Sequence, residues 1–102
     1  MRRLIGLALA AGLLVSCSIG EPAEDATGEE IFQQLCARCH GPDLSGGVGP
    51  ALGAGSNSAG ETDEFLEFTI VNGRGRMPSF SSSLDEAQVG RLIAYIREEQ
   101  GQ

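Results

Sequence analysis

Aromatic side chains are scarce in this 102-residue chain, which contains no tryptophan, one tyrosine and four phenylalanines. The length suits one domain and is too short for two. A core of this size stabilises a domain only modestly, and small domains usually add a disulfide, a metal or a cofactor. Because few aromatic rings are available to fill the interior, we expect a large bound group to occupy part of it.

Lysine is absent, and positive charge is rare. Residues 17–102 contain five arginines and fourteen acidic residues, which gives a formal charge of −9. This charge excludes general nucleic-acid binding and predicts repulsion from anionic lipid. We therefore expect a protein partner with a basic docking patch.

No stretch alternates apolar and polar residues for long enough to predict a strand, and no internal repeat is present. Apolar residues recur instead at helical spacing in residues 28–40, 62–73 and 85–99. Between the first two of these segments, residues 41–60 hold seven glycines and two prolines, which excludes a long regular element. The predicted fold class is all-α with long glycine-rich loops.

Two capping-box patterns predict where helices begin. Thr27 is followed three residues later by Glu30, and Asp85 is followed by Gln88. Gly73 is a suitable stop for the middle helix. The last helix carries an apolar face, which we expect in the core, formed by Val89, Leu92, Ile93 and Ile96.

The N-terminus has the pattern of a secretory signal. Arg2 and Arg3 precede an apolar run, residues 4–15, that is too short to span a membrane comfortably. Residues 14–17, LVSC, resemble a bacterial lipobox, in which cleavage precedes a cysteine that then carries lipid. We predict a lipoprotein signal peptide at 1–16 and a lipid anchor at Cys17. The alternatives are a buried N-terminal helix, or cleavage elsewhere that releases a soluble protein.

The next segment is acidic and has no apolar period, so residues 17–27 are interpreted as a lipidated cysteine and a tether. Ten residues extend about 30 Å at most. Residues 28–102 then form the domain. The protein is expected to be exported and held by lipid on the periplasmic or extracytoplasmic side of a membrane.

The sequence Cys36-Ala37-Arg38-Cys39-His40 is a CxxCH motif, which is typical of c-type haem attachment. One helical turn presents both thiols for thioether bonds to the two haem vinyl groups, with the imidazole of His40 beneath the iron. A disulfide, a zinc site and a thioredoxin-like pair are the alternatives. Zinc needs about four ligands, and the thioredoxin-like pair needs a βαβ setting, so both fit this chain poorly.

Few side chains in residues 17–102 could bind the haem iron opposite His40. Residues 17–102 hold one histidine, no lysine and one methionine, Met77. Pro78 follows it and restricts its backbone to extended conformations. We predict Met77 as the sixth iron ligand, against the alternative that it fills a gap in the core.

The chain from Gly28 to Glu99 resembles the class I cytochromes c, especially the short bacterial and photosynthetic carriers. Gly28, Phe32 and Cys36 repeat the family's N-terminal helix pattern, and residues 92–96, LIAYI, repeat its C-terminal helix pattern. Residues 72–78, NGRGRMP, resemble the axial-methionine loop. The resemblance implies a cytochrome c fold, with a middle helix and glycine-rich loops around one covalent haem c.

The resemblance also implies individual contacts. The N- and C-terminal helices should cross closely at Gly28, with Phe32 packed on Leu92 and Tyr95. The carbonyl of Pro50 should accept a hydrogen bond from the ligating imidazole. The family often has a Trp, Lys or Arg near a haem propionate, and this chain lacks both Trp and Lys. Arg74 or Arg76 is the candidate for that role, and the equal alternative is that both arginines are solvated surface charges.

His and Met ligation leaves no open iron site and suits reversible one-electron transfer. The predicted function is therefore an electron carrier, not an enzyme, that docks weakly as a monomer between a quinol-oxidising complex or other donor and a terminal oxidase or reductase. Two alternatives stay open. One is a haem enzyme or gas sensor with a labile Met77, and the other is a haem subunit of a larger redox complex.

Overall fold

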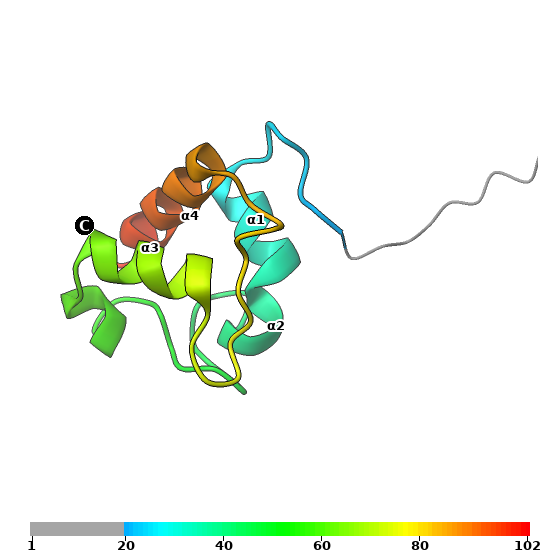
Figure 1. Cartoon of the computed structure of the whole chain (residues 1–102). Coiled ribbons are helices and arrows are strands. Elements are labelled where there is room, and N and C mark those ends of the chain that lie inside the picture. The colour runs from blue at the N-terminus through cyan, green and yellow to red at the C-terminus, as the bar shows by residue number, and fades with distance from the viewer. Residues whose placement is uncertain (1–19) are drawn as a thin grey trace, which may run out of the picture.

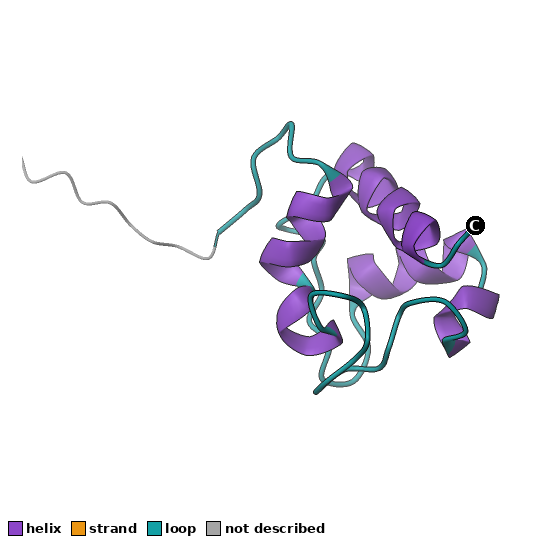
Figure 2. Cartoon of the chain, turned by 180° about the vertical axis from the view of Figure 1, so that it is seen from behind, coloured by secondary structure: helices purple, strands orange, loops and turns teal. Residues whose placement is uncertain are grey.

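Four α-helices and one 3₁₀ helix form the regular structure of residues 20–102, the part of the chain that the computed structural model describes (Figure 1 and Figure 2). The elements are α1 (Gly28–Leu35), α2 (Ala37–His40), the 3₁₀ helix η1 (Asn57–Gly60), α3 (Asp63–Asn72) and α4 (Glu86–Glu99). This part of the chain contains no strand, which confirms the all-α prediction. The predicted signal peptide and Cys17 lie outside the described residues. None of the helices within residues 20–102 is long and apolar enough to cross a membrane.

Both predicted capping boxes are present. The Glu30 amide donates to the Thr27 hydroxyl at 3.1 Å, and the Glu30 carboxylate accepts from the Thr27 amide. Asp85 and Gln88 exchange the same pair of bonds, each at 2.8 Å. These bonds satisfy amides that the first turn of a helix leaves without partners, so α1 and α4 begin where the sequence predicted.

The predicted single helix over residues 28–40 is wrong, because the structure divides it at Cys36. The backbone of Cys36 adopts φ −112° and ψ −34°, at the end of α1 and the start of α2. The Cys36 carbonyl accepts from the amides of both Cys39 (3.2 Å) and His40 (3.0 Å). Bonding to the amide three residues on tightens the turn that carries the motif.

Helices α1 and α4 cross at Gly28, as the family resemblance implied. A Cβ atom placed on Gly28 would lie 2.1 Å from the carbonyl oxygen of Arg91 and 2.8 Å from the Cβ of Tyr95. One helical turn on, the rings of Phe32 and Tyr95 pack at a centroid distance of 5.5 Å. Phe32 and Leu92 are both fully buried, so this crossing forms the centre of the core.

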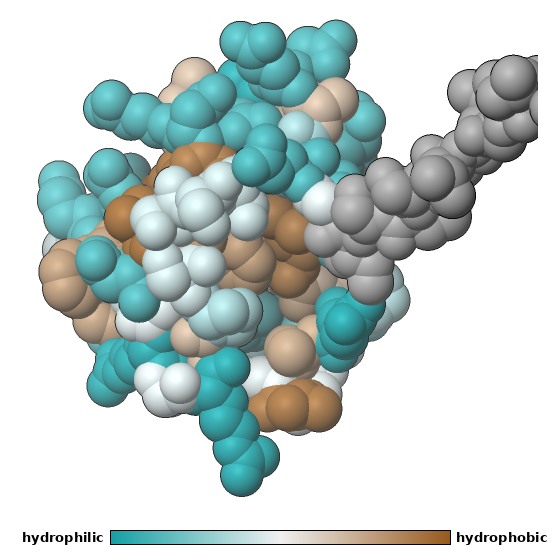
Figure 3. Space-filling view, turned by 45° about the vertical axis from the view of Figure 1, so that its right-hand side comes forward, coloured by the Kyte–Doolittle hydropathy of each residue, from teal (hydrophilic) through white to brown (hydrophobic). Residues whose placement is uncertain are grey.

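The core extends from this crossing to α3, which packs on α4 through Leu66 and Ile70. All four predicted apolar positions of α4 are buried (Val89, Leu92, Ile93 and Ile96). In the space-filling view, hydrophobic residues gather in the middle of one face and hydrophilic residues form most of its rim (Figure 3).

Arg97, near the C-terminal end of α4, holds the loop that leads into α3. Its guanidinium donates to the carbonyls of Ser58 and Glu61 and to the side chain of Gln100. It also pairs with the Asp63 carboxylate at 2.8 Å. The long glycine-rich segment, in which η1 is the only regular element, is thereby joined to the C-terminal helix.

Residues 20–27, here called the strap, lie against the domain. Pro22 and Ala26 are buried. Side chains of α1 and α4 donate hydrogen bonds to its backbone carbonyls: Gln34 to Gly20 (2.8 Å), Gln88 to Ala23 (3.2 Å), and Arg91 to Glu24 (2.8 Å) and Ala26 (3.0 Å). The described part of the predicted tether is therefore bound to the helices that follow it.

Candidate functional site

The CxxCH residues lie on the tightened turn between α1 and α2. Cys36 and His40 are buried, Cys39 is half-buried, and neither cysteine is in a disulfide. Cys36 belongs to the hydrophobic core that α1 and α4 share. The turn thus joins the rigid helix crossing to the residues that carry the chemistry.

The imidazole of His40 is oriented by the loop that follows it. Its Nδ1 lies 2.7 Å from the carbonyl oxygen of Pro50. Because a carbonyl only accepts, Nδ1 must carry the proton in this bond, and Nε2 is left with a free lone pair. The bond that the family resemblance implied is therefore present, and it fixes the tautomer that a metal ligand needs.

Backbone bonds wrap the same loop around the histidine. The Gly46 amide donates to the His40 carbonyl and the Gly49 amide donates to the Cys39 carbonyl, both at 2.7 Å. A Cβ on Gly49 would lie 3.1 Å from two atoms of the imidazole ring. The absence of a side chain at Gly49 lets the loop lie directly on the ring.

Leu44 is a structural residue that the sequence analysis did not single out. It is almost fully buried and has a positive φ of 63°, which is unusual for a residue with a Cβ. Its carbonyl accepts from the amides of Leu52 and Gly53, which closes the loop. The available signal was that it is one of only three large apolar residues in the glycine-rich stretch 41–60, with Val48 and Leu52.

Burial, assisted by the charge of Cys39, raises the pKa of the Cys36 thiol to about 12. In this packing a free Cys36 would stay protonated at neutral pH. A thiol is a weak nucleophile and a poor zinc ligand in that form. This buried environment suits the sulfur of an uncharged thioether better than it suits a redox-active thiol.

Met77 lies on a separate segment, in a tight hairpin after α3. The backbones of Arg74 and Met77 exchange two hydrogen bonds (3.1 and 2.9 Å), and Gly75 between them has a φ of 57°. A Cβ on Gly73 would lie 2.6 Å from the Met77 carbonyl, so only glycine permits this close return. Met77 is half-buried and packs against the hydrophobic core that includes Cys36.

The two arginines of this hairpin differ in their contacts. The guanidinium of Arg74 lies 5.7 Å from the ring centroid of Phe65, a cation–π arrangement. Both Arg74 and Arg76 are exposed. Their predicted role beside a haem propionate stays a prediction.

The donor set fits a covalently attached haem. It offers two thiols on one turn, an imidazole with a free Nε2, and a thioether sulfur on a second segment held by α3. The structure brings Cys36, Cys39, His40 and Pro50 together, and it places Met77 against the same core.

Comparison with known proteins identifies the family. The family model described as cytochrome c oxidase, cbb3-type, subunit III matches residues 23–96. Cytochrome c-551 of Bacillus subtilis is 38% identical over 99 residues, covering 84% of this chain and 85% of its own length.

Two larger proteins contain a similar region. A dihydro-haem d1 dehydrogenase of Pseudomonas aeruginosa is 40% identical over 92% of this chain, but the match spans only 18% of that protein. The crystal structure of cytochrome cL from Hyphomicrobium denitrificans superposes with a TM-score of 0.63 at 37% identity, covering 69% of this chain and 44% of that one. The chain thus spans less than half the length of either protein.

The family match covers most of the chain, and relatives of the same length align over nearly all of it, among them electron-transfer cytochromes. This chain belongs to the cytochrome c family, with the class I fold and one covalently attached haem c.

Proposed function

We propose that the protein transfers single electrons through a haem c held by four side chains, with thioether bonds to Cys36 and Cys39 and axial ligation by His40 and Met77. The observation that carries the proposal is the 2.7 Å bond from His40 Nδ1 to the Pro50 carbonyl. It gives the only histidine of the chain the tautomer of a metal ligand, on the turn that bears both thiols.

A haem iron with His and Met ligands supplies reversible one-electron chemistry with little ligand exchange. The chain's contribution is to keep both ligands in place. The Pro50 carbonyl and Gly49 orient the imidazole, and the hairpin closed by Arg74 limits how far Met77 can move. With His40 and Met77 both bound to the iron, the haem would offer no site for a substrate, which fits a carrier.

The ligation is tested by comparing wild-type holoprotein with Met77→Leu and with Ser82→Ala, an exposed position on the same loop. Wild type and Ser82→Ala should show the methionine-sulfur charge-transfer band when oxidised, and should not bind carbon monoxide when reduced at neutral pH. Met77→Leu should lose the band and bind carbon monoxide. Prompt carbon monoxide binding by the wild type would contradict the proposal.

The similarity to part of a dihydro-haem d1 dehydrogenase favours one alternative, a haem enzyme or gas sensor in which Met77 is labile. The carbon monoxide experiment separates it from the carrier. The family description, which names an oxidase subunit, favours another, a haem subunit of a larger complex. Size-exclusion of the native protein extracted in detergent distinguishes these, because a monomeric carrier elutes alone.

The proposal includes export and a lipid anchor at Cys17, supported by the lipobox-like residues 14–17. Two or more acyl chains would hold the protein stably at a membrane. Cys17→Ala should release the haemoprotein from membranes, while Ser18→Ala should not. Unchanged fractionation of Cys17→Ala would count against the anchor.

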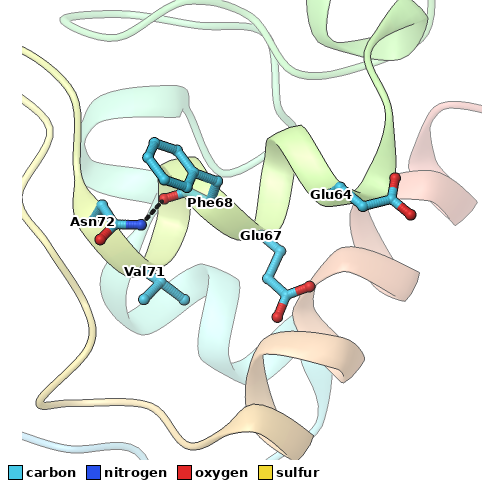
Figure 4. A pocket seen from close by; sticks show the side chains of 5 residues that line it. All are labelled: Glu64, Glu67, Phe68, Val71 and Asn72. Carbon is cyan, nitrogen blue, oxygen red and sulfur yellow. Dashed lines mark hydrogen bonds between the residues drawn. The ribbon is translucent and has the colours of Figure 1, made fainter.

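We further propose a partner with a basic docking patch, between a quinol-oxidising complex or other donor and a terminal oxidase or reductase. An exposed face of α3 supports this, where Phe68 is 66% exposed and lines a shallow hollow with Val71 and Asn72 (Figure 4). Glu64 and Glu67 line the same shallow hollow. An apolar centre with acids at one end complements a basic patch that has an apolar residue within it.

A further inference from the structure

The strap changes how far the domain can move from its anchor. As a free tether, residues 18–27 would extend about 30 Å. With Gly20 bound to α1, only Ser18 and Ile19 separate the strap from Cys17. The distance from Cys17 to Gly20 is then limited to about 10 Å.

Several independent contacts hold the strap. Arg91 donates from Nε and Nη2 to two of its carbonyls, and bonds from a charged donor are roughly twice as strong as neutral ones. Gln88, which bonds to the Ala23 carbonyl, is itself buried, so releasing the strap would leave its amide without a partner. The family match begins at residue 23, within the strap.

The strap enters the domain beside the haem-attachment turn. Gly20 bonds to Gln34, which lies in the last turn of α1 and two residues before Cys36. Both ribbon views place this entry on the opposite side of the molecule from α3 (Figure 1 and Figure 2). An anchor at Cys17 would therefore turn the haem-attachment side toward the membrane and leave the Phe68 face of α3 away from it.

We propose that the strap fixes the height and orientation of the domain over the bilayer, and that the redox partner is an integral membrane complex whose docking surface extends no farther from that bilayer than the Phe68 face of the anchored domain. This inference rests on the proposed lipid anchor at Cys17. A soluble partner would need no such restraint. A partner projecting far from the membrane would be out of reach.

Electrostatic repulsion from the membrane is what the bound strap would counteract. The strap and the start of α1 expose five acids (Glu21, Glu24, Asp25, Glu29 and Glu30). An anionic leaflet repels them within a Debye length, about 8 Å at physiological ionic strength. A free tether would let the domain drift outward, whereas the bound strap keeps it near the surface.

The first test concerns the strap alone. It uses holoprotein that carries the Cys17→Ala substitution, so that no lipid is attached. Hydrogen exchange should show a protected amide at Ala26, which donates to the Ala23 carbonyl at 2.9 Å. Gln34→Ala combined with Arg91→Ala should remove this protection. Gln33→Ala, a neighbouring glutamine that bonds to Pro42 instead, should keep it. An unprotected Ala26 amide in the parent protein would overturn the inference.

The second test measures height, with lipidated holoprotein on vesicles that carry a headgroup fluorophore quenched by haem. Wild type and Gln33→Ala should quench strongly. The Gln34→Ala, Arg91→Ala variant should quench less, and a variant with ten Gly/Ser residues inserted after Ser18 should quench least. Equal quenching by all four would overturn the inference and leave the carrier function standing.

The third test concerns the partner. In native membranes supplied with quinol, the insertion should lower turnover by roughly five-fold, because a longer tether dilutes the domain near its partner, while reduction by soluble ascorbate should be unchanged. Unchanged turnover in membranes would overturn the partner assignment. If wild type does not bind vesicles at all, the anchor at Cys17 is wrong and the orientation falls with it, whereas the exchange result on the strap is unaffected.

Discussion

Gly28 shows how one residue sets the distance between two helices. Alanine there would place its Cβ 2.1 Å from a backbone oxygen of α4, which cannot move aside as a side chain could. We expect Gly28→Ala to destabilise the holoprotein by about 3 kcal/mol, the upper range for overpacking. Denaturant unfolding followed by the Soret band measures this.

Gly90 provides the matched control, since it lies in α4 and a Cβ there meets nothing within 4 Å. Gly90→Ala should stabilise the protein by about 0.5–1 kcal/mol, because alanine loses less backbone entropy in a helix. A Gly28→Ala protein as stable as wild type would show that the helices do not cross as closely as described.

Gly49 controls the histidine in the same way. A Cβ at 3.1 Å from the ring would push the imidazole or the loop outward and lengthen the bond from His40 to Pro50. A weaker bond makes the imidazole a poorer donor to ferric iron. We expect Gly49→Ala to raise the reduction potential by roughly 40 mV, equivalent to about 1 kcal/mol for one electron.

Gly60→Ala is the control for this experiment, because a Cβ there meets nothing within 4 Å. Its potential, measured by redox titration, should equal that of the wild type. If both variants keep the wild-type potential, the loop tolerates the added methyl group and does not orient the ring.

The residues of the site divide into those that the sequence could predict and those that it could not. The CxxCH spacing predicted which side chains share a turn, and the family resemblance implied the contact with Pro50, which the structure contains. Gly49 and Leu44 were not predicted. Their roles depend on how the loop returns to His40, and a glycine-rich segment carries no periodic pattern that specifies its path.

At the scale of elements, apolar spacing predicted α3 and α4 nearly residue for residue, because caps and stops bound each helix. The division between α1 and α2 was missed. Periodicity reports which residues face the interior, and Phe32 and His40, on either side of the change in backbone angle at Cys36, are both buried. A kink that preserves the buried face leaves no trace in the pattern.

Arg97 is expected to stabilise the junction between α4 and the loop into α3. Arg97→Ala would leave the carbonyls of Ser58 and Glu61 without their charged donor, at a cost of about 2–3 kcal/mol. Hydrogen exchange in residues 52–61 should rise together with the loss of stability against denaturant.

Asp63→Ala separates the ion pair from the rest of this network. The Asp63 side chain is 66% exposed, so its pair with Arg97 should contribute less than about 1 kcal/mol. Equal losses from both variants would mean that the ion pair, and not the bonds to backbone carbonyls, holds the loop.

At the scale of the whole molecule, composition left the path of one segment open. Residues 18–27 are acidic and lack an apolar period, which predicted a tether, and residues 20–27 of that tether are bound to the domain. The binding uses its backbone carbonyls, and these are the same whatever the side chains. Only the partner side chains on α1 and α4 distinguish a strap from a linker, and sequence alone does not pair them.

The rate of docking depends either on the net charge of the protein or on the charges beside the contact. Two variants that have the same net charge, but lose their acids at different places, separate these cases. Beyond a Debye length of about 8 Å the charges on the far side of the domain are screened, so the acids beside the contact should govern association. Glu64→Gln with Glu67→Gln removes two charges from the Phe68 face, and Glu98→Gln with Glu99→Gln removes two from the end of α4.

Electron transfer to the native membrane complex should slow as salt rises in the wild type, because a basic patch attracts the acidic carrier. The α3 pair should lower the second-order rate at low salt by roughly three- to ten-fold and flatten its salt dependence, whereas the α4 pair should keep the wild-type slope. Stopped-flow oxidation of reduced holoprotein measures both, with thermal unfolding as a check on the fold. If the two double variants slow equally, only net charge matters and the Phe68 face is not the docking surface. If the wild-type rate rises with salt, the partner's surface is acidic.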